Sequence, residues 1–311
     1  MRFAPPVTPA PRSHSLLAPS QPALSPQAAA ALCRSVESAL LQNSLLLHYQ
    51  PVVSLTRSRV VGVEALLRWN HPTLGVLAPG HFACAFDNPR LAAKIGLFVL
   101  KRAIVQAQLW LAERLPFGRL AINVVAADFA SGTFADHVLD SLATHGVATK
   151  RFALEVTEGV FLDSADGQVS AGLRTLHDAG LEIAFDDFGT GFASLTHLKS
   201  ESIDRLKIDR SFVDGLGRNR ADASIVAAIV QLGRNLGKAI TAEGVETAEQ
   251  IDLLRGMGCD EFQGYALARP MPAADVPAFV AQFDTEALHF RAPSYAIHSN
   301  SDSKIIGLRP I

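Results

Sequence analysis

Stretches with the pattern of β-strands alternate with stretches of helical periodicity along most of this chain, and no other feature limits its fold as strongly. The strand-like runs cover residues 45–55, 60–69, 120–125, 152–158, 182–187, 204–209, 239–245 and 261–267. Most intervals after the second run carry a helical pattern, as at 94–115, 170–180, 223–237 and 247–258. Eight strands with intervening helices over about 250 residues predict a β/α barrel. A doubly wound open sheet is the alternative architecture.

The first two runs are expected to break the parallel pattern. Only TRSRV, at 56–60, separates them. This connection is too short for a right-handed crossover between parallel strands, so the two strands should pair antiparallel. We therefore predict an α/β fold, a modified TIM (β/α)8 barrel with an antiparallel first strand.

Composition divides the chain into three parts. Residues 1–30 are rich in Pro, Ala and Ser without periodicity and are interpreted as a disordered leader, residues 31–287 as one globular domain, and residues 288–311 as a flexible tail. The prolines of the leader interrupt any signal-peptide core, and no run approaches the roughly 18 apolar residues of a membrane span. We expect a soluble, cytoplasmic protein.

Charge and cysteine content exclude several classes of function. The net charge is −2 with mixed signs, which argues against binding to DNA or to a membrane surface. Cys33, Cys84 and Cys259 are far apart and lack C-x-x-C spacing, so neither a disulfide framework nor a structural zinc site is expected.

Polar residues recur at one parity of the strand-like runs. Side chains alternate between the two faces of a strand, and the apolar parity suits packing against helices. The other parity places six polar residues near the carboxyl ends of their strands: Glu64, Asn123, Glu155, Asp186, Lys207 and Glu243. Active sites of β/α barrels lie at that end. Four of the six are carboxylates, which one lysine cannot balance, and Asp187 and Glu246 follow closely.

An excess of buried carboxylates requires protons or cations, because like charges raise each other's pKa. Carboxylate and amide oxygens suit Mg²⁺ or Mn²⁺, and two such ions fit in-line displacement at phosphorus. Each residue also has a plainer interpretation: Glu64 as a salt-bridge partner, Asn123 as a capping residue, Lys207 as a solvated lysine. Six strands that each place a polar residue at the inward parity favour the metal site.

Adjacent Asp186 and Asp187 raise a geometric question, since neighbours on a regular strand point to opposite faces. Both can enter the barrel only if the chain turns between them. We expect Gly189 and Gly191 to permit that departure, because glycine accepts backbone angles that other residues resist.

At these residues the sequence resembles the EAL-domain cyclic di-GMP phosphodiesterases of bacteria. The matching motifs are YQP (49–51), EALLRW (64–69), INV (122–124), LEVTEG (154–159), DDFGTGFASL (186–195), LKIDRSFV (206–213), AEGVET (242–247) and QGYALARPM (263–271). They occur in order, so the domain at 31–287 is identified as an EAL phosphodiesterase domain.

The resemblance implies a metal-dependent hydrolysis of cyclic di-GMP to linear pGpG, with two Mg²⁺ or Mn²⁺ ions per site, which lowers a bacterial second messenger. The implied metal ligands are Glu64, Asn123, Glu155, Asp186, Asp187 and Glu243. The implied catalytic residues are Glu243 as general base, Lys207 holding the attacking water, and Glu64. The implied substrate contacts are Gln50, Leu66, Arg68, Asp209, Glu246 and Gln263. Glu158 would anchor the loop after Asp187.

The same resemblance implies a homodimer through the barrel and leaves open an unidentified regulatory protein partner. Two departures from the family pattern lie outside the implied metal ligands: Val125 replaces a usual Ser, and the segment 83–91 is atypical. A non-hydrolytic cyclic di-GMP sensor or protein-interaction module is the alternative function. A metal-dependent barrel acting on another phosphoester is a third.

Overall fold

Eight strands close into a ring at the centre of the molecule. The computed structural model describes residues 26–162, 167–189, 198 and 202–286. The ring runs in the order β1-β9-β8-β7-β6-β5-β4-β2 and closes by pairing of β1 with β2. Its strands are β1 (Leu45–Ser54), β2 (Arg59–His71), β4 (Arg119–Val124), β5 (Phe152–Thr157), β6 (Glu182–Phe188), β7 (Arg205–Ile208), β8 (Ala239–Ala242) and β9 (Glu261–Phe262). The barrel prediction is confirmed, and the open sheet is excluded.

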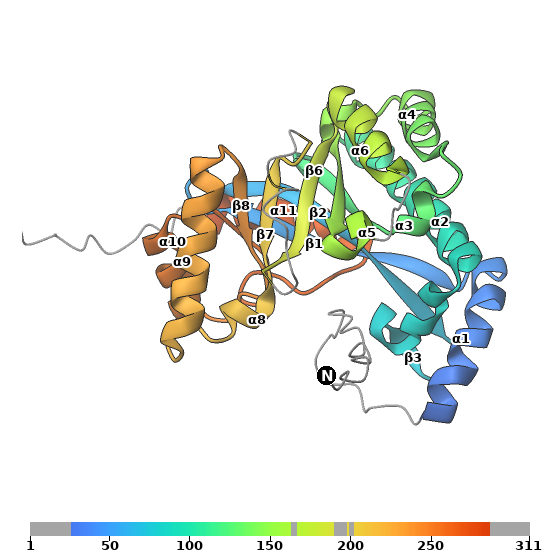
Figure 1. Ribbon diagram of the computed structural model, residues 1–311, viewed down its shortest axis with the longest axis horizontal. Coiled ribbons are helices and arrows are strands. Elements are labelled where there is room, and N and C mark those ends of the chain that lie inside the picture. The colour runs from blue at the N-terminus through green and yellow to red at the C-terminus, as the bar shows by residue number, and fades with distance from the viewer. Residues whose placement is uncertain (1–25, 163–166, 190–197, 199–201, 287–311) are drawn as a thin grey trace, which may run out of the picture.

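The first strand runs against its neighbours, as the short connection after it predicts. β1 pairs antiparallel with both β2 and β9, whereas the other neighbours in the ring pair parallel. The β1–β2 ribbon extends past the barrel toward α1 and β3 (Figure 1). There the unpredicted strand β3 (Gly75–Leu77) pairs with the outer end of β2.

The last two strands are shorter than predicted. β8 ends at Ala242 rather than 245, and β9 ends at Phe262 rather than 267. A glycine follows each end: Gly244 has a φ of +65°, and a Cβ on Gly264 would lie 2.1 Å from the Val245 carbonyl oxygen. These two turns bend away from the sheet and pack on each other, which hydrophobicity alone does not reveal.

Helices surround the ring (Figure 1). The α-helices are α1 (Pro26–Leu41), α2 (Pro89–Ala112), α3 (Ala126–Phe129), α4 (Phe134–Thr144), α5 (Glu158–Leu162), α6 (Gln168–Asp178), α8 (Arg210–Val213), α9 (Arg220–Asn235), α10 (Ala248–Met257) and α11 (Val276–Glu286). Short 3-10 segments are η1 (Pro79–Asp87), η2 (Thr149–Arg151) and η3 (Ala273–Asp275). The four predicted helical stretches are confirmed as α2, α6, α9 and α10. The inward faces of α2, α4, α6 and α9 contribute buried side chains to one continuous core.

Helix α2 is the longest of the described helices, and the atypical segment at 83–91 leads into it. The Asn88 side chain accepts hydrogen bonds from the backbone N–H groups of Arg90 and Leu91 at 3.1 and 3.2 Å, and Pro89 takes the first helical position. Asn before Pro is therefore a helix start here. By length and composition alone α2 would suffice to cross a membrane, but its inner face belongs to the core: Trp110 is 1% exposed and packs edge-on against Tyr49 at 4.9 Å.

The two ends of the chain and the cysteines were each the subject of an expectation. Most of the predicted leader, up to residue 25, and the predicted tail lie outside the described residues, and α1 already begins at Pro26. The cysteine spacing argues against a disulfide framework, yet Cys84 is disulfide-bonded, while Cys259 is a buried free thiol. Motif spacing reports local pairs and is blind to cysteines that the fold brings together.

Asp128 of α3 is a carboxyl buried under α2. It is 8% exposed, and its Oδ2 accepts the backbone N–H of Val125 at 2.8 Å. A Cβ on Gly96 would lie only 1.9 Å from Oδ1, so α2 packs directly on this group. Burial raises the pKa of Asp128 from 3.8 to about 7, against the lowering effect of the Val125 hydrogen bond.

This shift predicts a pH-dependent stability. Between pH 4 and 7 the folded state holds on Asp128 a proton that the unfolded chain has released, so the contribution of Asp128 to the free energy of unfolding should fall as pH rises and level off above 7. Asp128→Asn keeps an acceptor for Val125 and should remove this contribution, which makes the slope smaller and gives a gain of about 1–3 kcal/mol at pH 8. Urea unfolding from pH 4 to 8 measures this. The exposed Asp140→Asn in α4 is the control and should keep the slope; an unchanged slope in Asp128→Asn would contradict the assignment.

Candidate metal and active site

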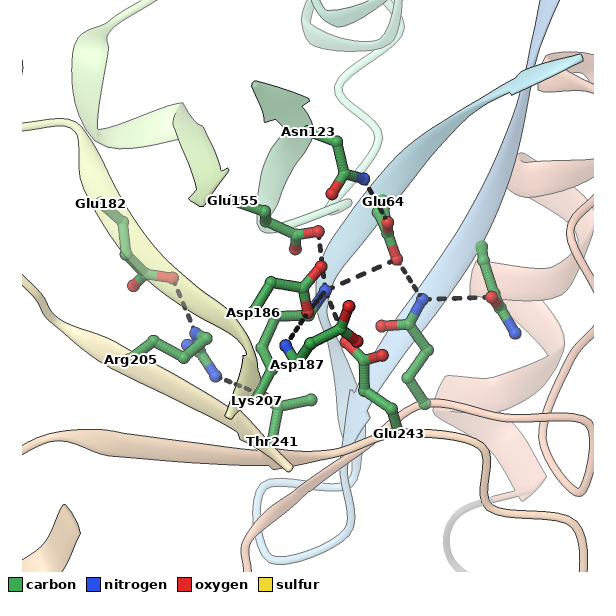
Figure 2. A network of polar contacts seen from close by, with 12 residues as sticks. Glu64, Asn123, Glu155, Glu182, Asp186, Asp187, Arg205, Lys207, Thr241 and Glu243 are labelled. Carbon is green, nitrogen blue, oxygen red and sulfur yellow. Dashed lines mark hydrogen bonds and ion pairs between the residues drawn. The ribbon is translucent and has the colours of Figure 1, made fainter. Parts of the chain in front are cut away.

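The six polar residues predicted at the inward parity converge inside the barrel, near the carboxyl ends of their strands (Figure 2). Glu64 comes from β2, Asn123 from β4, Glu155 from β5, Asp186 from β6, Lys207 from β7, and Glu243 directly follows β8. Lys207 is 2% exposed, Glu155 4% and Glu64 6%. These side chains lie in one cluster, buried except for the partly exposed Asn123 and Glu243, and their roles stay predictions.

The ammonium of Lys207 lies at the centre of this cluster. Its Nζ is 2.7 Å from Glu155 Oε2, 3.1 Å from Asp186 Oδ1 and 2.5 Å from Glu243 Oε1, and it is 3.8 Å from Glu64 Oε2. An ammonium has three donors, so three close carboxylates saturate it. Lys207 is therefore not a solvated lysine.

Glu64 is held by side-chain amides rather than by the lysine. Asn123 Nδ2 donates to Glu64 Oε1 at 2.7 Å, and Gln263 Nε2 donates to Glu64 Oε2 at 2.6 Å. Gln263 Nε2 also lies 3.1 Å from Gln50 Oε1, and Gln50 Nε2 donates to the Ala268 carbonyl at 3.0 Å. Gln50 and Gln263, expected as substrate contacts, thus form a buried chain that orients Glu64.

Asp186 and Asp187 both face the centre of the site, as the notion of a turn between them requires (Figure 2). The turn is made at Asp187 itself, which has a φ of +52°, and the β6–β7 register shifts between Phe185 and Phe188. Asp is among the residues that tolerate this left-handed conformation. Gly189 follows with a φ of +100°, while Gly191 lies outside the described residues. The expected glycine turn therefore begins one residue earlier, at Asp187, and continues through Gly189.

Burial and mutual repulsion decide the protonation of the cluster. Burial raises the pKa of Glu155 well above its ordinary value, with Glu64 adding to the effect, and burial likewise raises the pKa of Glu243. Burial raises the pKa of Asp187 to about 8, helped by the charges of Asp186 and Asp209. Without cations, the site therefore keeps several of its acids protonated near neutral pH.

The donor set fits divalent cations that prefer oxygen. Carboxylate oxygens of Asp186, Asp187 and Glu243 lie within 4.8 Å of one another. The remaining oxygen ligands would be Glu64, Asn123 and Glu155, and no His or Cys belongs to this cluster as described. Mg²⁺ and Mn²⁺ favour such donors, whereas zinc favours N and S ligands. Cations bound here would neutralise the carboxylates, which without cations are relieved of mutual repulsion by protonation.

The other predicted substrate residues lie around the cluster. Leu66 and Arg68 are half-buried on the β1–β2 ribbon, and burial lowers the pKa of Arg68. Asp209 caps α8 by accepting from Ser211, at 2.9 Å from its N–H. Glu246 is 38% exposed and accepts from Arg210 Nη2 at 2.7 Å. The sequence analysis did not predict that Arg210 binds Glu246. Its position directly after Asp209, at the end of a predicted strand, is the signal that could have indicated a residue near the site.

Glu158 lies at the first position of α5, directly after β5. Its Oε1 is buried and has no hydrogen-bond partner among the described residues. The loop that it is expected to anchor, after Gly189, lies largely outside those residues. The anchoring role stays a prediction.

An eight-stranded barrel with an acidic cluster at the carboxyl ends of its strands defines a TIM-like barrel protein whose site suits divalent metal ions. The chain belongs to the EAL domain family, whose model matches residues 34–270.

Named relatives agree with this family. The chain is 42% identical over 250 residues to the bifunctional diguanylate cyclase/cyclic di-GMP phosphodiesterase MucR of Pseudomonas aeruginosa, covering 80% of this chain and 36% of MucR. It is 38% identical over 223 residues to the cyclic di-GMP phosphodiesterase PA2567 of the same species, covering 72% and 38%. A c-di-GMP complex of the PaMucR phosphodiesterase matches with a TM-score of 0.74 at 41% identity, over 79% of this chain and 99% of that one. The chain spans about a third of the length of these curated relatives.

Asp187 supplies a test of the cation site that needs no turnover. Asp187→Asn removes a repelled acid, so at pH 8 the metal-free variant should match or exceed the wild type in thermal stability. Saturating Mn²⁺ should stabilise the wild type by about 2–4 kcal/mol at 100 to 1,000 times the dissociation constant, and the variant by less. Thermal unfolding with EDTA or Mn²⁺ measures both. The exposed Asp260→Asn is the control, and equal Mn²⁺ stabilisation of Asp187→Asn would show that Asp187 is no ligand.

Proposed function

We propose that this chain is a metal-dependent phosphodiesterase that hydrolyses cyclic di-GMP to linear pGpG. The observation that carries the proposal is the complete acidic cluster around Lys207, in a chain similar to proteins described as cyclic di-GMP phosphodiesterases. Every predicted metal ligand is present at the site, and neither departure from the family pattern falls on one of them.

In this proposal, Glu64, Asn123, Glu155, Asp186, Asp187 and Glu243 hold two Mg²⁺ or Mn²⁺ ions. Such ions supply positive charge to phosphate oxygens and lower the pKa of bound water. Lys207 is buried and keeps its proton. With the carboxylates of Glu155, Asp186 and Glu243 drawn to the cations, one of its N–H groups would donate to the attacking water and orient it. Glu243, whose Oε1 lies 2.5 Å from Lys207 Nζ, accepts the proton of that water.

The β1–β2 ribbon is proposed to hold the dinucleotide beside the cluster. Arg68 offers a planar guanidinium that suits a phosphate or a stacked base, and Leu66 offers an apolar contact on the same strand face. Asp209, Glu246, Gln50 and Gln263 complete the proposed contacts. Gln263 Oε1 is buried without a hydrogen-bond partner among the described residues, so it can accept from a ligand.

Three further attributes belong to the same proposal. The protein acts in the cytoplasm: within the part of the chain that the structure describes, the one helix apolar enough to cross a membrane, α2, has its inner face in the barrel core. It forms a homodimer through the barrel, and Glu158 anchors the loop between the site and the partner. The atypical segment at 83–91 and Val125 act on rate or assembly rather than on the ligands.

The competing function is a cyclic di-GMP sensor that binds without hydrolysis. The two are separated by incubating the protein with cyclic di-GMP and Mg²⁺ or Mn²⁺ and following pGpG by chromatography. Binding without turnover under either ion would establish the sensor. Turnover of other phosphodiesters in preference to cyclic di-GMP would favour the third function, a barrel hydrolase of different specificity.

Substitution of Glu64 tests whether this residue is a metal ligand. Glu64→Gln keeps the volume and one carbonyl acceptor but loses the negative charge, and Glu64→Ala loses both. We expect either change to lower kcat by at least about 100-fold, since a metal ligand is lost, while far-UV circular dichroism stays that of a folded barrel. The exposed Glu113→Ala at the end of α2 should retain full turnover. Rates of Glu64→Ala close to wild type would refute the metal assignment.

A further inference from the structure

A second polar layer lies inside the barrel, beneath the metal site and away from its open end. Arg205 of β7 occupies its centre and is 10% exposed (Figure 2). Arg205 Nε donates to Glu182 Oε1 at 2.8 Å, and Nη1 donates to Thr241 Oγ1 at 2.7 Å and also to Glu261 Oε2. One guanidinium thus connects β7 with β6, β8 and β9.

Most members of this layer precede a residue of the site along the same chain segment. Arg205, Thr241 and Glu261 come two residues before Lys207, Glu243 and Gln263, and Glu182 comes four residues before Asp186. Strand alternation turns Glu182, Asp186, Arg205 and Lys207 inward, while Glu243 and Gln263 directly follow the ends of β8 and β9. The strands that Arg205 connects are those that deliver Lys207, both aspartates, Glu243 and Gln263.

The opposite half of the lower layer has one described ion pair, between Arg119 of β4 and Glu182 of β6. It is lined by Gly62, Ala121, Ala153 and Ala184, which leave a cavity of about 30 Å³ between the layers. That volume holds about two water molecules. Glu155 and Lys207 of the site and Arg119 and Arg205 of the lower layer also line this cavity.

Charge balance distinguishes the two layers. Arg205 and Arg119 face Glu182 and Glu261, with Arg119 Nη1 3.0 Å from Glu182 Oε2, so the lower layer is neutral by itself. Burial lowers the pKa of Arg205, but Glu182 and Glu261 outweigh it, and the guanidinium stays charged. Buried ion pairs add little to stability compared with apolar packing, because desolvation offsets their attraction. Their directional bonds do fix the positions of the strands that carry them.

We propose that Arg205 is a positioning residue for the metal site: it holds β6, β8 and β9 against β7 so that Asp186, Asp187, Lys207 and Glu243 keep the spacing that binds cations. This rests on the proposed function for its catalytic consequence, but not for its effect on metal binding. Among the described residues, Arg205 bonds to Glu182, Thr241 and Glu261, none of which is a proposed metal ligand or substrate contact. Its removal therefore acts on metal affinity and kcat and leaves KM nearly unchanged.

Arg205→Lys is the decisive variant. It keeps the charge, but a lysine ammonium is a single point of contact that cannot hold three partners in one plane. We expect Mn²⁺ affinity, measured by isothermal titration without substrate, to fall about tenfold, as on loss of other supporting contacts to ligands. With cyclic di-GMP, kcat should fall by a similar factor while KM stays within about twofold.

Arg119→Lys is the matched control, because it makes the same chemical change at the 42%-exposed arginine that binds the same Glu182. It should keep wild-type Mn²⁺ affinity and kcat. A role confined to stability would lower the thermal midpoint of Arg205→Lys but leave its Mn²⁺ affinity at 20 °C unchanged, and that result would overturn the proposal.

The proposal can also be judged if Arg205→Lys does not fold or if the wild type shows no turnover. If Arg205→Lys fails to fold, Thr241→Val is the variant to test, because it removes one hydrogen bond of Arg205 with little change in volume. A two- to threefold loss of Mn²⁺ affinity in Thr241→Val supports the proposal. An unchanged affinity overturns it. Should the wild type bind Mn²⁺ but not hydrolyse cyclic di-GMP, the proposed function fails while the Mn²⁺ comparison still judges Arg205. A wild type that binds no Mn²⁺ overturns both.

Discussion

The contact of one buried ammonium with several buried carboxylates governs this molecule. Lys207 lies within 3.1 Å of three acids and 3.8 Å of a fourth, and Asp187 adds a further acid to the same space. A closed barrel offers these groups no route to bulk water except at the carboxyl ends of its strands. The excess of acid must be met by protons or by cations, and the oxygen donors on all sides favour cations. Closure of the barrel therefore leaves buried negative charge, and the metal ions of the proposed function would neutralise it.

Reversal of the first strand shapes what can approach this site. Because β1 pairs with β2 as a two-stranded ribbon, both strands extend past the ring as one unit without needing helices on their flanks. Glu64 lies opposite Gln50 in this ribbon, and Leu66 and Arg68 follow on the same strand face above it. An all-parallel barrel would end near the level of Glu64. The antiparallel start thus places Leu66 and Arg68, the proposed substrate contacts, on the same strand as Glu64.

Interior positions were predictable because a single physical rule, alternation along a strand, controls them. It placed Glu64, Asn123, Glu155, Asp186, Lys207 and Glu243 correctly, and the short connection at 56–60 predicted the reversed strand. What depends on contacts between distant segments was not predictable in this way. The turn at Asp187, the early ends of β8 and β9 beside Gly244 and Gly264, and the disulfide of Cys84 belong to that class. Glu261 and Arg205 obey the same alternation as Lys207, two residues below the site, so attention to the full strand would have revealed the lower layer.

Comparison of the two interior layers shows why ligand chemistry is confined to one end. Both layers bury charge at similar depth, since Arg205 is 10% exposed and Lys207 is 2% exposed. In the lower layer two arginines face two glutamates and every charge has a partner of opposite sign. In the upper layer five carboxylates share one lysine, so attraction within the protein cannot satisfy them. A buried site binds cations where the fold leaves negative charge uncompensated, and in this barrel the lower layer is balanced while the upper one is not. The balanced layer can then serve as the rigid floor on which the unbalanced one is built.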